Sequence, residues 1–418
     1  MAEAYIIDAV RTPRSIGKMG KGALSTMHPQ HIAATVLKAL KDRNNLDTAE
    51  VDDIIWGTSA QMGLQGGDMG RMAALDAGFD IKASGVTLDR FCGSGITAVS
   101  LAAAQVMSGM EDLVIAGGTE MMSYVNDHGA KIRAAGVGGA GGLGGSNPRL
   151  QAKHPQSHQG VCADAIASME GISRADLEKF GVESQRRAAV AIAEGRFAKS
   201  VVPVLDDEGN VVLDREEYPR PDTSVETLAA MKPAFEMFRD YPSQDGGPTF
   251  GQLIQQKYPD LDIVPVHHVG TSSGVVDGAA AILLASKAYA EAHGLKPRAR
   301  IVATANIGDC PTLMLNAPVA AAKKVLAKAG LTKDDIDVWE VNEAFAVVAE
   351  KFIRDLDLDR AKVNPNGGSI ALGHPIGATG AILIGTALDE LERTGGRYGL
   401  ITMCAAGGMA PAIVIERV

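Results

Sequence analysis

The stretch Thr87–Ser100 reads TLDRFCGSGITAVS and places one cysteine, Cys92, between an apolar lead-in and an alanine-rich run. Two glycines follow the cysteine at short spacing, which predicts a strand that turns sharply into a helix with the sulfur at the helix N-terminus. Unpaired backbone N–H groups and the positive end of the helix dipole lie there, and both favour a thiolate over a thiol. The pattern therefore predicts a nucleophilic cysteine; a buried core cysteine beside a helix cap is the alternative.

A second stretch, Asn364–Gly380, reads NPNGGSIALGHPIGATG and frames His374 with glycines and a proline just before another helix. A histidine in this setting can take the proton of a nearby thiol. Trp56 precedes Cys92 by 36 positions, and Trp339 precedes His374 by 35. We infer a duplicated α/β unit whose copies pack face to face and bring the two residues to equivalent helix starts near a pseudo-twofold axis; chance similarity of α/β units is the alternative. Each half continues into an apolar strand that ends in Gly-Gly, at Gly117–Gly118 and at Gly407–Gly408.

Short apolar runs alternate with alanine-rich helical segments along most of the chain, which indicates an α/β protein with helices layered around a largely parallel sheet. From about Met121 the pattern changes: Gly136–Gly145 predicts a flexible loop or tip, and prolines are frequent between Pro203 and Pro265. We therefore take residues 122–268 as an insertion that can shape a binding site. Strands are expected at 4–10, 53–57, 112–118, 279–285, 300–306, 397–403 and 410–416, a hairpin at 201–218, and helices at 29–42, 69–77, 174–194, 317–329, 343–356 and 377–393.

The composition excludes several classes of protein. The 418 residues are 46% hydrophobic and 22% charged, enough for more than one domain. A net charge of −10 without a basic tail argues against a nucleic-acid partner, so an anionic substrate would need a local basic pocket. The sequence has no signal peptide, no stretch of roughly 18 uninterrupted apolar residues and no Ser-Lys-Leu ending, which predicts a cytoplasmic protein without a membrane span.

Further residues carry chemistry near the C-terminus. Cys404 ends an apolar strand, so its thiol could shuttle a proton while downstream N–H groups stabilise an oxyanion; core packing is the alternative. Asn342 and Glu343 stand at a predicted helix start, where the amide would hold a water; an N-cap is the alternative. No Cys-x-x-Cys pair occurs, so neither a zinc cage nor a disulfide framework is indicated for the four cysteines, Cys92, Cys162, Cys310 and Cys404.

Taken in order, these motifs resemble those of the thiolase family over essentially the whole chain. The resemblance implies a duplicated thiolase fold, with a five-layer αβαβα core from two related halves and an inserted loop domain. We expect the N-terminal thiolase half at 1–121, the inserted coenzyme-A-binding loop domain at 122–268 and the C-terminal thiolase half at 269–418. The matching motifs are CGSG at Cys92–Gly95, DGAAA at Asp277–Ala281, NEAF at Asn342–Phe345, GHPIGATG at Gly373–Gly380, and Cys404 before a glycine-rich end.

The resemblance implies an acyltransferase with five catalytic residues. Cys92 attacks the thioester or 3-keto carbonyl and carries the acyl group, and His374 activates it. His374 also stabilises the enolate oxygen, together with a water held by Asn342. Cys404 acts as general acid and base at the acetyl Cα, and the N–H groups of Cys92 and Ala406 form a second oxyanion hole. The resemblance implies no metal and no cofactor, with coenzyme A as a co-substrate.

The resemblance also implies coenzyme A contacts from four residues. Ser273 would touch pantetheine, Arg220 and Thr227 would lie near the nucleotide, and His158 would lie near the acyl end. An arginine there meets the need for local positive charge in an acidic protein.

Three departures from the family pattern matter. His158–Gly160 reads HQG where many thiolases have His-Met-Gly over the acyl pocket, so chain-length preference is not inferred. His268–Gly274 reads HVGTSSG, which retains the pantetheine serine and lacks the usual asparagine. Cys404–Gly408 reads CAAGG in place of Cys-x-Gly-Gly-Gly, so Ala406 donates its N–H from a more restricted backbone.

The predicted activity is coenzyme-A-dependent cleavage of 3-oxoacyl-CoA to acetyl-CoA and a shortened acyl-CoA, as in β-oxidation in fatty acid metabolism, or the reverse Claisen condensation. We favour cleavage because the altered pocket loop departs from the short-chain biosynthetic pattern; an acetoacetyl-CoA-forming acetyl-CoA acetyltransferase is the alternative. A decarboxylating condensing enzyme fits less well, because such enzymes have no counterpart of Cys404. A non-catalytic acyl-CoA-binding protein also fits less well, because it would not need all four of Cys92, Asn342, His374 and Cys404. Thiolases are dimers or tetramers, so the resemblance predicts a homodimer or homotetramer. The sequence identifies no hydratase or dehydrogenase partner.

Overall fold

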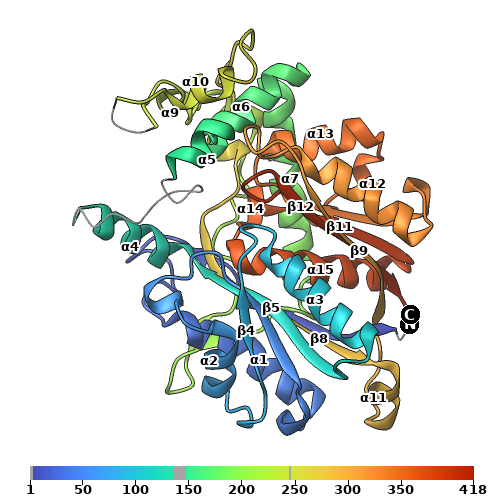
Figure 1. Cartoon of the computed structure of the whole chain (residues 1–418). Helices are drawn as coiled ribbons and strands as arrows, with labels where there is room; N and C mark the ends of the chain where they lie inside the picture. Colours follow the sequence, from blue (N-terminus) through green and yellow to red (C-terminus); the bar gives the residue numbers. More distant parts are fainter. Residues whose placement is uncertain (1–2, 135–146, 244–245) are drawn as a thin grey trace.

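The computed structural model describes residues 3–134, 147–243 and 246–418 (Figure 1). The loop predicted at Gly136–Gly145 lies outside the described residues. The expected helices and strands are present, with ends that differ by a few residues from the predicted ones.

Five strands of the N-terminal half lie in the order β4–β3–β5–β8–β1. β3 is parallel to β4 and β5, whereas β8 is antiparallel to β5 and to β1. Because β8 pairs with N-terminal strands, the N-terminal layer includes a strand that follows the predicted boundary at residue 269; the division into domains itself stays a prediction. The strands are β1 (Ala4–Arg11), β3 (Asp53–Gly57), β4 (Val86–Leu88), β5 (Leu113–Met121) and β8 (Val276–Ser286), with β2 (Ser15–Ile16) paired to β8.

The C-terminal half repeats this arrangement in the order β10–β11–β12–β9. β10 is parallel to β11, and β12 is antiparallel to β11 and β9. An isolated parallel bridge from Trp339 to Val363 takes the place that the pairing of Trp56 with Thr87 has in the first half. The strands are β9 (Ala299–Gly308), β10 (Val338–Val341), β11 (Tyr398–Thr402) and β12 (Met409–Arg417).

Two predictions are wrong, one about the sheet and one about the repeat. The sheet is mixed and not largely parallel, in part because the short connection 403–408 between β11 and β12 can only join antiparallel neighbours. The two Gly-Gly pairs are not equivalent: Trp56 pairs with Gly117 inside β5, whereas Trp339 pairs with Leu400, so Gly407–Gly408 lies in the turn beyond β11.

The core consists of five layers, as the αβαβα prediction requires. β1 and β9 pair through two residue pairs, so the strands form one ten-stranded sheet that folds around a central pair of helices, α3 (Ser94–Ser108) and α15 (Ile376–Thr394). Alternation along β8 shows the layering: Ile282 and Leu284 pack on the central helices, and Leu283 packs on the outer side. The outer layers are α1 (Pro29–Asn44) and α2 (Met69–Asp76) on one side and α12 (Ala317–Ala329) and α13 (Ala346–Leu356) on the other.

The central helices approach each other through glycine. A Cβ placed on Gly380 of α15 would lie 2.1 Å from the backbone nitrogen of Ile96 and 2.7 Å from the carbonyl carbon of Gly95 in α3. Only a residue without a side chain permits this approach. Cys92 precedes the first residue of α3 by two positions, and His374 precedes the first residue of α15 by two, so the two stretches do occupy equivalent helix starts.

Most helices of the segment between β5 and β8 lie at one end of the layers (Figure 1), whereas its hairpin packs against the outer helix α1. The corresponding connection in the C-terminal half, 403–408, is a turn. The predicted hairpin is present as β6 and β7. Elements of the segment are α4 (Met122–Ala134), α5 (Pro148–Lys153), α6 (Gln159–Glu170), α7 (Arg174–Ala193), β6 (Val204–Leu205), β7 (Val211–Leu213), α8 (Val225–Ala229), α9 (Glu236–Arg239), α10 (Phe250–Gln255) and η3 (Val269–Thr271). The remaining elements are η1 (Thr48–Glu50), η2 (Gly63–Gln65), α11 (Lys287–Ala292), η4 (Lys333–Asp335), η5 (Arg360–Lys362) and α14 (Ser369–Leu372).

Within the described residues, Phe91–Ser108 is the one helical segment long and apolar enough to cross a membrane by length and composition. Its window is 67% buried, and α3 is covered by strands on both sides. The apolar character of this segment is accounted for by its place in the core.

The glycine contact predicts a large difference between two Gly→Ala substitutions on α15. Gly380→Ala should destabilise the fold by about 3 kcal/mol, because the backbone of α3 must move to admit the methyl group. Gly385→Ala should change stability by less than about 1 kcal/mol, because the nearest atom to its Cβ is the Ala9 Cβ at 3.4 Å. Urea denaturation midpoints measure both, and equal midpoints would contradict the close approach.

Candidate active site

Cys92 lies in the turn that joins β4 to α3, as the sequence predicted. The preceding residue, Phe91, has a φ of 49°, a left-handed conformation rare for an aromatic residue. Ser94 secures the turn: its Oγ donates to the Phe91 carbonyl at 2.6 Å and accepts from the Arg90 backbone N–H at 2.9 Å. The strained turn thereby fixes where the sulfur points.

The expectation that Cys92 favours the thiolate form is wrong. Burial, and next the charge of Glu120, raise the pKa of this thiol to about 12. The backbone N–H groups of Cys92 and Ala406 act in the opposite direction without outweighing burial. The resting residue is therefore a thiol at neutral pH, and forming the nucleophile requires a base.

His374 has one ring nitrogen that can accept a proton. Thr379 Oγ1 donates to the Pro375 carbonyl at 2.9 Å, so at its 2.5 Å contact with His374 Nδ1 the hydroxyl accepts a proton from the ring. This assigns the proton to Nδ1 and leaves a lone pair on Nε2. Burial lowers the pKa of His374 to about 4, so the imidazole is neutral near pH 7.

Asn342 lies beside this lone pair. Its Nδ2 is 3.5 Å from His374 Nε2, and its Oδ1 accepts a 2.5 Å hydrogen bond from Ser369 Oγ, which fixes the amide with Nδ2 toward the histidine. The N-cap alternative is wrong, because α13 starts at Ala346 and its N-cap is Phe345. The buried amide can donate to an oxygen or a water held next to His374.

Cys404 and Ala406 lie in the turn that follows β11 and leads into β12. Cys404 is buried, and burial, followed by the neighbouring Cys92 sulfur, raises the pKa of its thiol. The Ala406 N–H lies against the Cys92 sulfur, so the alanine that replaces glycine retains the donor geometry. Gly407 and Gly408, both at φ 77°, complete the tight turn back into β12. The structure thus brings Cys92, Cys404 and Ala406 together.

Two buried carboxylates organise the site, and the sequence pattern assigned neither role. Glu120, in β5, accepts from the Gly377 N–H at the start of α15 and from the Gln65 side chain. Glu343 accepts from Ser184 Oγ at 2.6 Å, from Asn364 Nδ2 and from the Ile370 N–H. Both carboxylates tie distant segments to the stretch that carries His374. A charged residue at the end of an apolar strand is the sequence signal that could have indicated Glu120.

Three of the four predicted coenzyme A contacts, Ser273, Arg220 and Thr227, lie outside this cluster. Ser273 is adjacent to it, because its N–H donates to the Ala344 carbonyl at 3.0 Å. Arg220 is exposed and stacks on Tyr218 with its guanidinium carbon 5.4 Å from the ring centroid. The Thr227 hydroxyl bonds to the backbone of Ser224 and caps α8.

His158 forms part of an aromatic wall. Its ring stacks on Phe238 with centroids 4.4 Å apart and an interplanar angle of 3°, and Phe235 and Phe250 flank it. Its Nδ1 accepts from the Gly160 N–H, and burial lowers the pKa of the ring. This wall belongs to the same apolar cluster as Cys404 and Ala406.

Comparison with known proteins identifies the family. The model of the thiolase N-terminal domain matches residues 4–238, and that of the thiolase C-terminal domain matches residues 295–417. The chain belongs to the thiolase family. A thiolase is an acyltransferase of coenzyme A thioesters, so this chain catalyses coenzyme-A-dependent cleavage of a 3-oxoacyl-CoA or the reverse condensation, as the sequence predicted.

Individual relatives support the assignment along the full length of this thiolase. The steroid 3-ketoacyl-CoA thiolase FadA6 of Mycobacterium tuberculosis is 40% identical, with 100% of this chain and 95% of the relative aligned. A β-ketoadipyl-CoA thiolase of Acinetobacter baylyi is also 40% identical, with both chains fully covered. The crystal structure of the Bacillus anthracis acetyl-CoA acetyltransferase superposes with a TM-score of 0.83 at 30% identity, covering 100% of this chain and 99% of the other.

The contact between Thr379 and His374 predicts that activity depends on the acceptor that keeps the proton of His374 on Nδ1. Thr379→Val keeps the shape of the side chain and removes the acceptor for Nδ1–H, so kcat/KM should fall by roughly 100-fold. Thr379→Ser should restore most of the activity. Thr386→Val is the matched control, because the Thr386 hydroxyl bonds only within α15, to the Ile382 carbonyl. Equal losses in the Thr379 and Thr386 valine variants would contradict the assignment.

The pKa of Cys92 predicts how its alkylation depends on pH. With a pKa near 12, its rate of reaction with iodoacetamide should rise about tenfold for each pH unit from 7 to 10. Cys310 provides an internal comparison: burial raises the pKa of its thiol, but hydrogen bonds from Tyr258 and Lys257 outweigh this and lower it, so its alkylation should level off at lower pH. Peptide mass spectrometry resolves the two sites. A rate at Cys92 that is flat across neutral pH would indicate a preformed ion pair with His374.

Proposed function

We propose that this thiolase acts in the direction of cleavage, through a thioester on Cys92. The observation that supports this proposal is the arrangement around two sulfurs. His374 Nε2 lies beside the Asn342 amide, and the Cys404 thiol and the Ala406 N–H lie beside Cys92; Glu120, whose charge acts on Cys92, accepts from the Gly377 N–H three residues after His374. Such a site holds one nucleophile, two proton carriers and two sets of donors for negative oxygen.

In the first half-reaction, Cys92 transfers its proton to His374 Nε2 and its sulfur attacks the 3-keto carbon of the substrate. The oxygen becomes negative and is stabilised by the N–H groups of Cys92 and Ala406. When the tetrahedral adduct collapses, the bond between C2 and C3 breaks and its electron pair passes to the acetyl-CoA enolate. The imidazolium of His374 and the donor at Asn342 stabilise the enolate oxygen, and Cys404 delivers a proton to C2.

In the second half-reaction, Cys404 takes the proton of the coenzyme A thiol, which attacks the thioester on Cys92. The shortened acyl group leaves as acyl-CoA, and Cys92 recovers its proton from His374. Both catalytic cysteines therefore end as thiols, the form that burial favours for each of them. The cycle consumes one coenzyme A and leaves the protein unchanged.

The proposal extends to the acyl group, which we take to be larger than acetyl. The wall of His158 and its neighbouring phenylalanines is apolar and aromatic, and Gln159 begins α6 beside it. The relatives named above act, by their names, on steroid and β-ketoadipyl thioesters. Condensation of two acetyl-CoA molecules is the second candidate, favoured by the similarity to the Bacillus anthracis acetyl-CoA acetyltransferase.

The mechanism above uses side chains, the backbone N–H groups of Cys92 and Ala406, and coenzyme A. Among residues 3–134, 147–243 and 246–418, no group of three or more histidine, cysteine or acidic residues is arranged to hold a metal ion. Three expectations stay predictions: contacts of coenzyme A with Ser273, Arg220 and Thr227, a homodimeric or homotetrameric assembly, and a cytoplasmic location.

The edge strand β4 supports the predicted assembly. It presents Val86 with 44% of its surface exposed, and a second copy of the chain would cover this edge.

The test of the proposed function is coenzyme-A-dependent cleavage of a ladder of 3-oxoacyl-CoA substrates. It begins with acetoacetyl-CoA, continues to longer chains and includes 3-oxoadipyl-CoA. We expect kcat/KM to rise by about tenfold or more from acetoacetyl-CoA to the preferred substrate, since each buried methylene contributes about 0.8 kcal/mol. Cys92→Ala should abolish cleavage at every length, whereas Cys162→Ala, a buried cysteine outside the proposed mechanism, should not. A maximum at acetoacetyl-CoA would favour the condensing alternative.

A further inference from the structure

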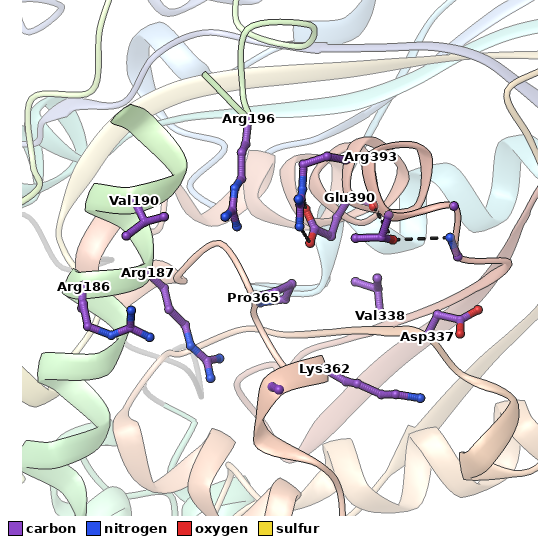
Figure 2. Close-up of a pocket in the computed structure, with 14 residues that line it drawn as sticks. Arg186, Arg187, Val190, Arg196, Asp337, Val338, Lys362, Pro365, Glu390 and Arg393 are labelled. Atoms are coloured by element: carbon purple, nitrogen blue, oxygen red, sulfur yellow. Dashed lines mark hydrogen bonds and ion pairs between the residues drawn. The ribbon is translucent and has the colours of Figure 1, made fainter. Parts of the chain in front are cut away.

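A basic cleft lies where α7, the segment after it, η5 and the end of α15 meet (Figure 2). Its volume is about 660 Å³, within the range of small-molecule sites. Figure 2 shows side chains from these separate segments around one hollow. We call it the arginine cleft and define it by five cationic residues, Arg186, Arg187, Arg196, Lys362 and Arg393.

The charge of the arginine cleft is opposite to that of the protein. The chain has a net charge of −10, yet five cationic residues line the cleft against two acidic ones, Asp337 and Glu390. Both carboxylates are already engaged. Asp337 accepts from the backbone N–H groups of Arg397 and Tyr398, and Glu390 accepts from Arg393 and Asn366. Beside the cleft, Glu183 pairs with Arg186 and Arg187, and Glu194 pairs with Arg196, so the five cations exceed these four carboxylates by one.

Several of the cations have hydrogen-bonding capacity beyond their intramolecular bonds. Arg186 binds Glu183, and Arg393 binds Glu390, in each case through Nε and Nη2, so Nη1 of both is outside these bonds. Lys362 Nζ carries three protons and bonds to the Ile336 carbonyl. An anion in the cleft can accept from these groups without breaking the ion pairs.

The arginine cleft is separate from the active site and from the predicted coenzyme A contacts. Arg393 lies in the last turn of the 19-residue helix α15, whereas His374 precedes its first turn, and such a helix is roughly 28 Å long. On α7, Gln185 accepts from the Arg220 N–H, while Arg186 and Val190 face the cleft. Residues 185 and 186 are about 100° apart around a helix, so the two sites lie on different faces.

We propose that the arginine cleft binds a small molecule that carries two or more phosphate groups. Guanidinium groups match phosphate oxygens with paired N–H donors, and donors from separate segments suit a ligand with several charged groups. The volume of the cleft fits a compact metabolite. In a protein of net charge −10, these cations give the cleft a local attraction for anions.

The test is calorimetric titration of the full-length protein with inorganic pyrophosphate. We expect one site per chain, with binding that weakens as salt is raised. Arg186→Gln combined with Arg393→Gln should weaken binding at least about tenfold, because two charge-assisted donors are lost. These side chains are 60% and 44% exposed, so the variant should fold, and its thermal midpoint checks this. Arg215→Gln, an arginine that is 87% exposed in the insertion, is the matched control and should bind as the parent does.

Three outcomes would overturn the proposal. The first is the absence of binding to the parent protein. The second is equal affinity in the double variant and the control, which would mean that pyrophosphate binds without these arginines. The third is loss of binding when coenzyme A is saturating, which would assign the pyrophosphate to the coenzyme A site. Cleavage of 3-oxoacyl-CoA by the double variant, measured alongside, shows that the active site is intact.

Discussion

The backbone contact between α3 and α15 is the constraint on which the rest of the structure depends. Gly95 and Gly380 bring the two central helices together, and the strands of both halves pack around them. Each helix starts two residues after a residue proposed for catalysis, Cys92 or His374. The geometry of the site is therefore a property of the packing of two halves, and neither half contains it alone.

Burial in this packing determines the chemistry of the resting site. Both the Cys92 thiol and the His374 imidazole are neutral, because the interior disfavours the charged form of each group. A preformed ion pair would be buried at a cost of several kcal/mol. The donors at Ala406 and Asn342 instead face the places where charge develops in the proposed reaction, so charge is stabilised when the substrate brings it.

Much of this arrangement could be predicted from the sequence because it is encoded locally. The turn around Cys92, the loop before α15 and the repeat that relates them depend on glycine positions and on spacing. The thiolate prediction failed because burial is contributed by distant strands and outweighs the helix terminus. Glu120 was missed for a similar reason: its partners Ser59, Gln65 and Gly377 are scattered along the chain. The role of Thr379 needed the direction of one hydroxyl proton, which no sequence motif specifies.

The unequal connections of the two halves have an evolutionary consequence. The N-terminal half joins β5 to β8 through an insertion that carries His158 and its aromatic neighbours, whereas the C-terminal half joins β11 to β12 through the turn that carries Cys404. After duplication, one copy could accumulate changes in this connection while the other kept the compact turn. New acyl groups could thus be accepted by remodelling one loop-rich segment, with the reaction chemistry inherited unchanged. The fold places the aromatic wall around His158 and the turn that carries Cys404 on separate connections.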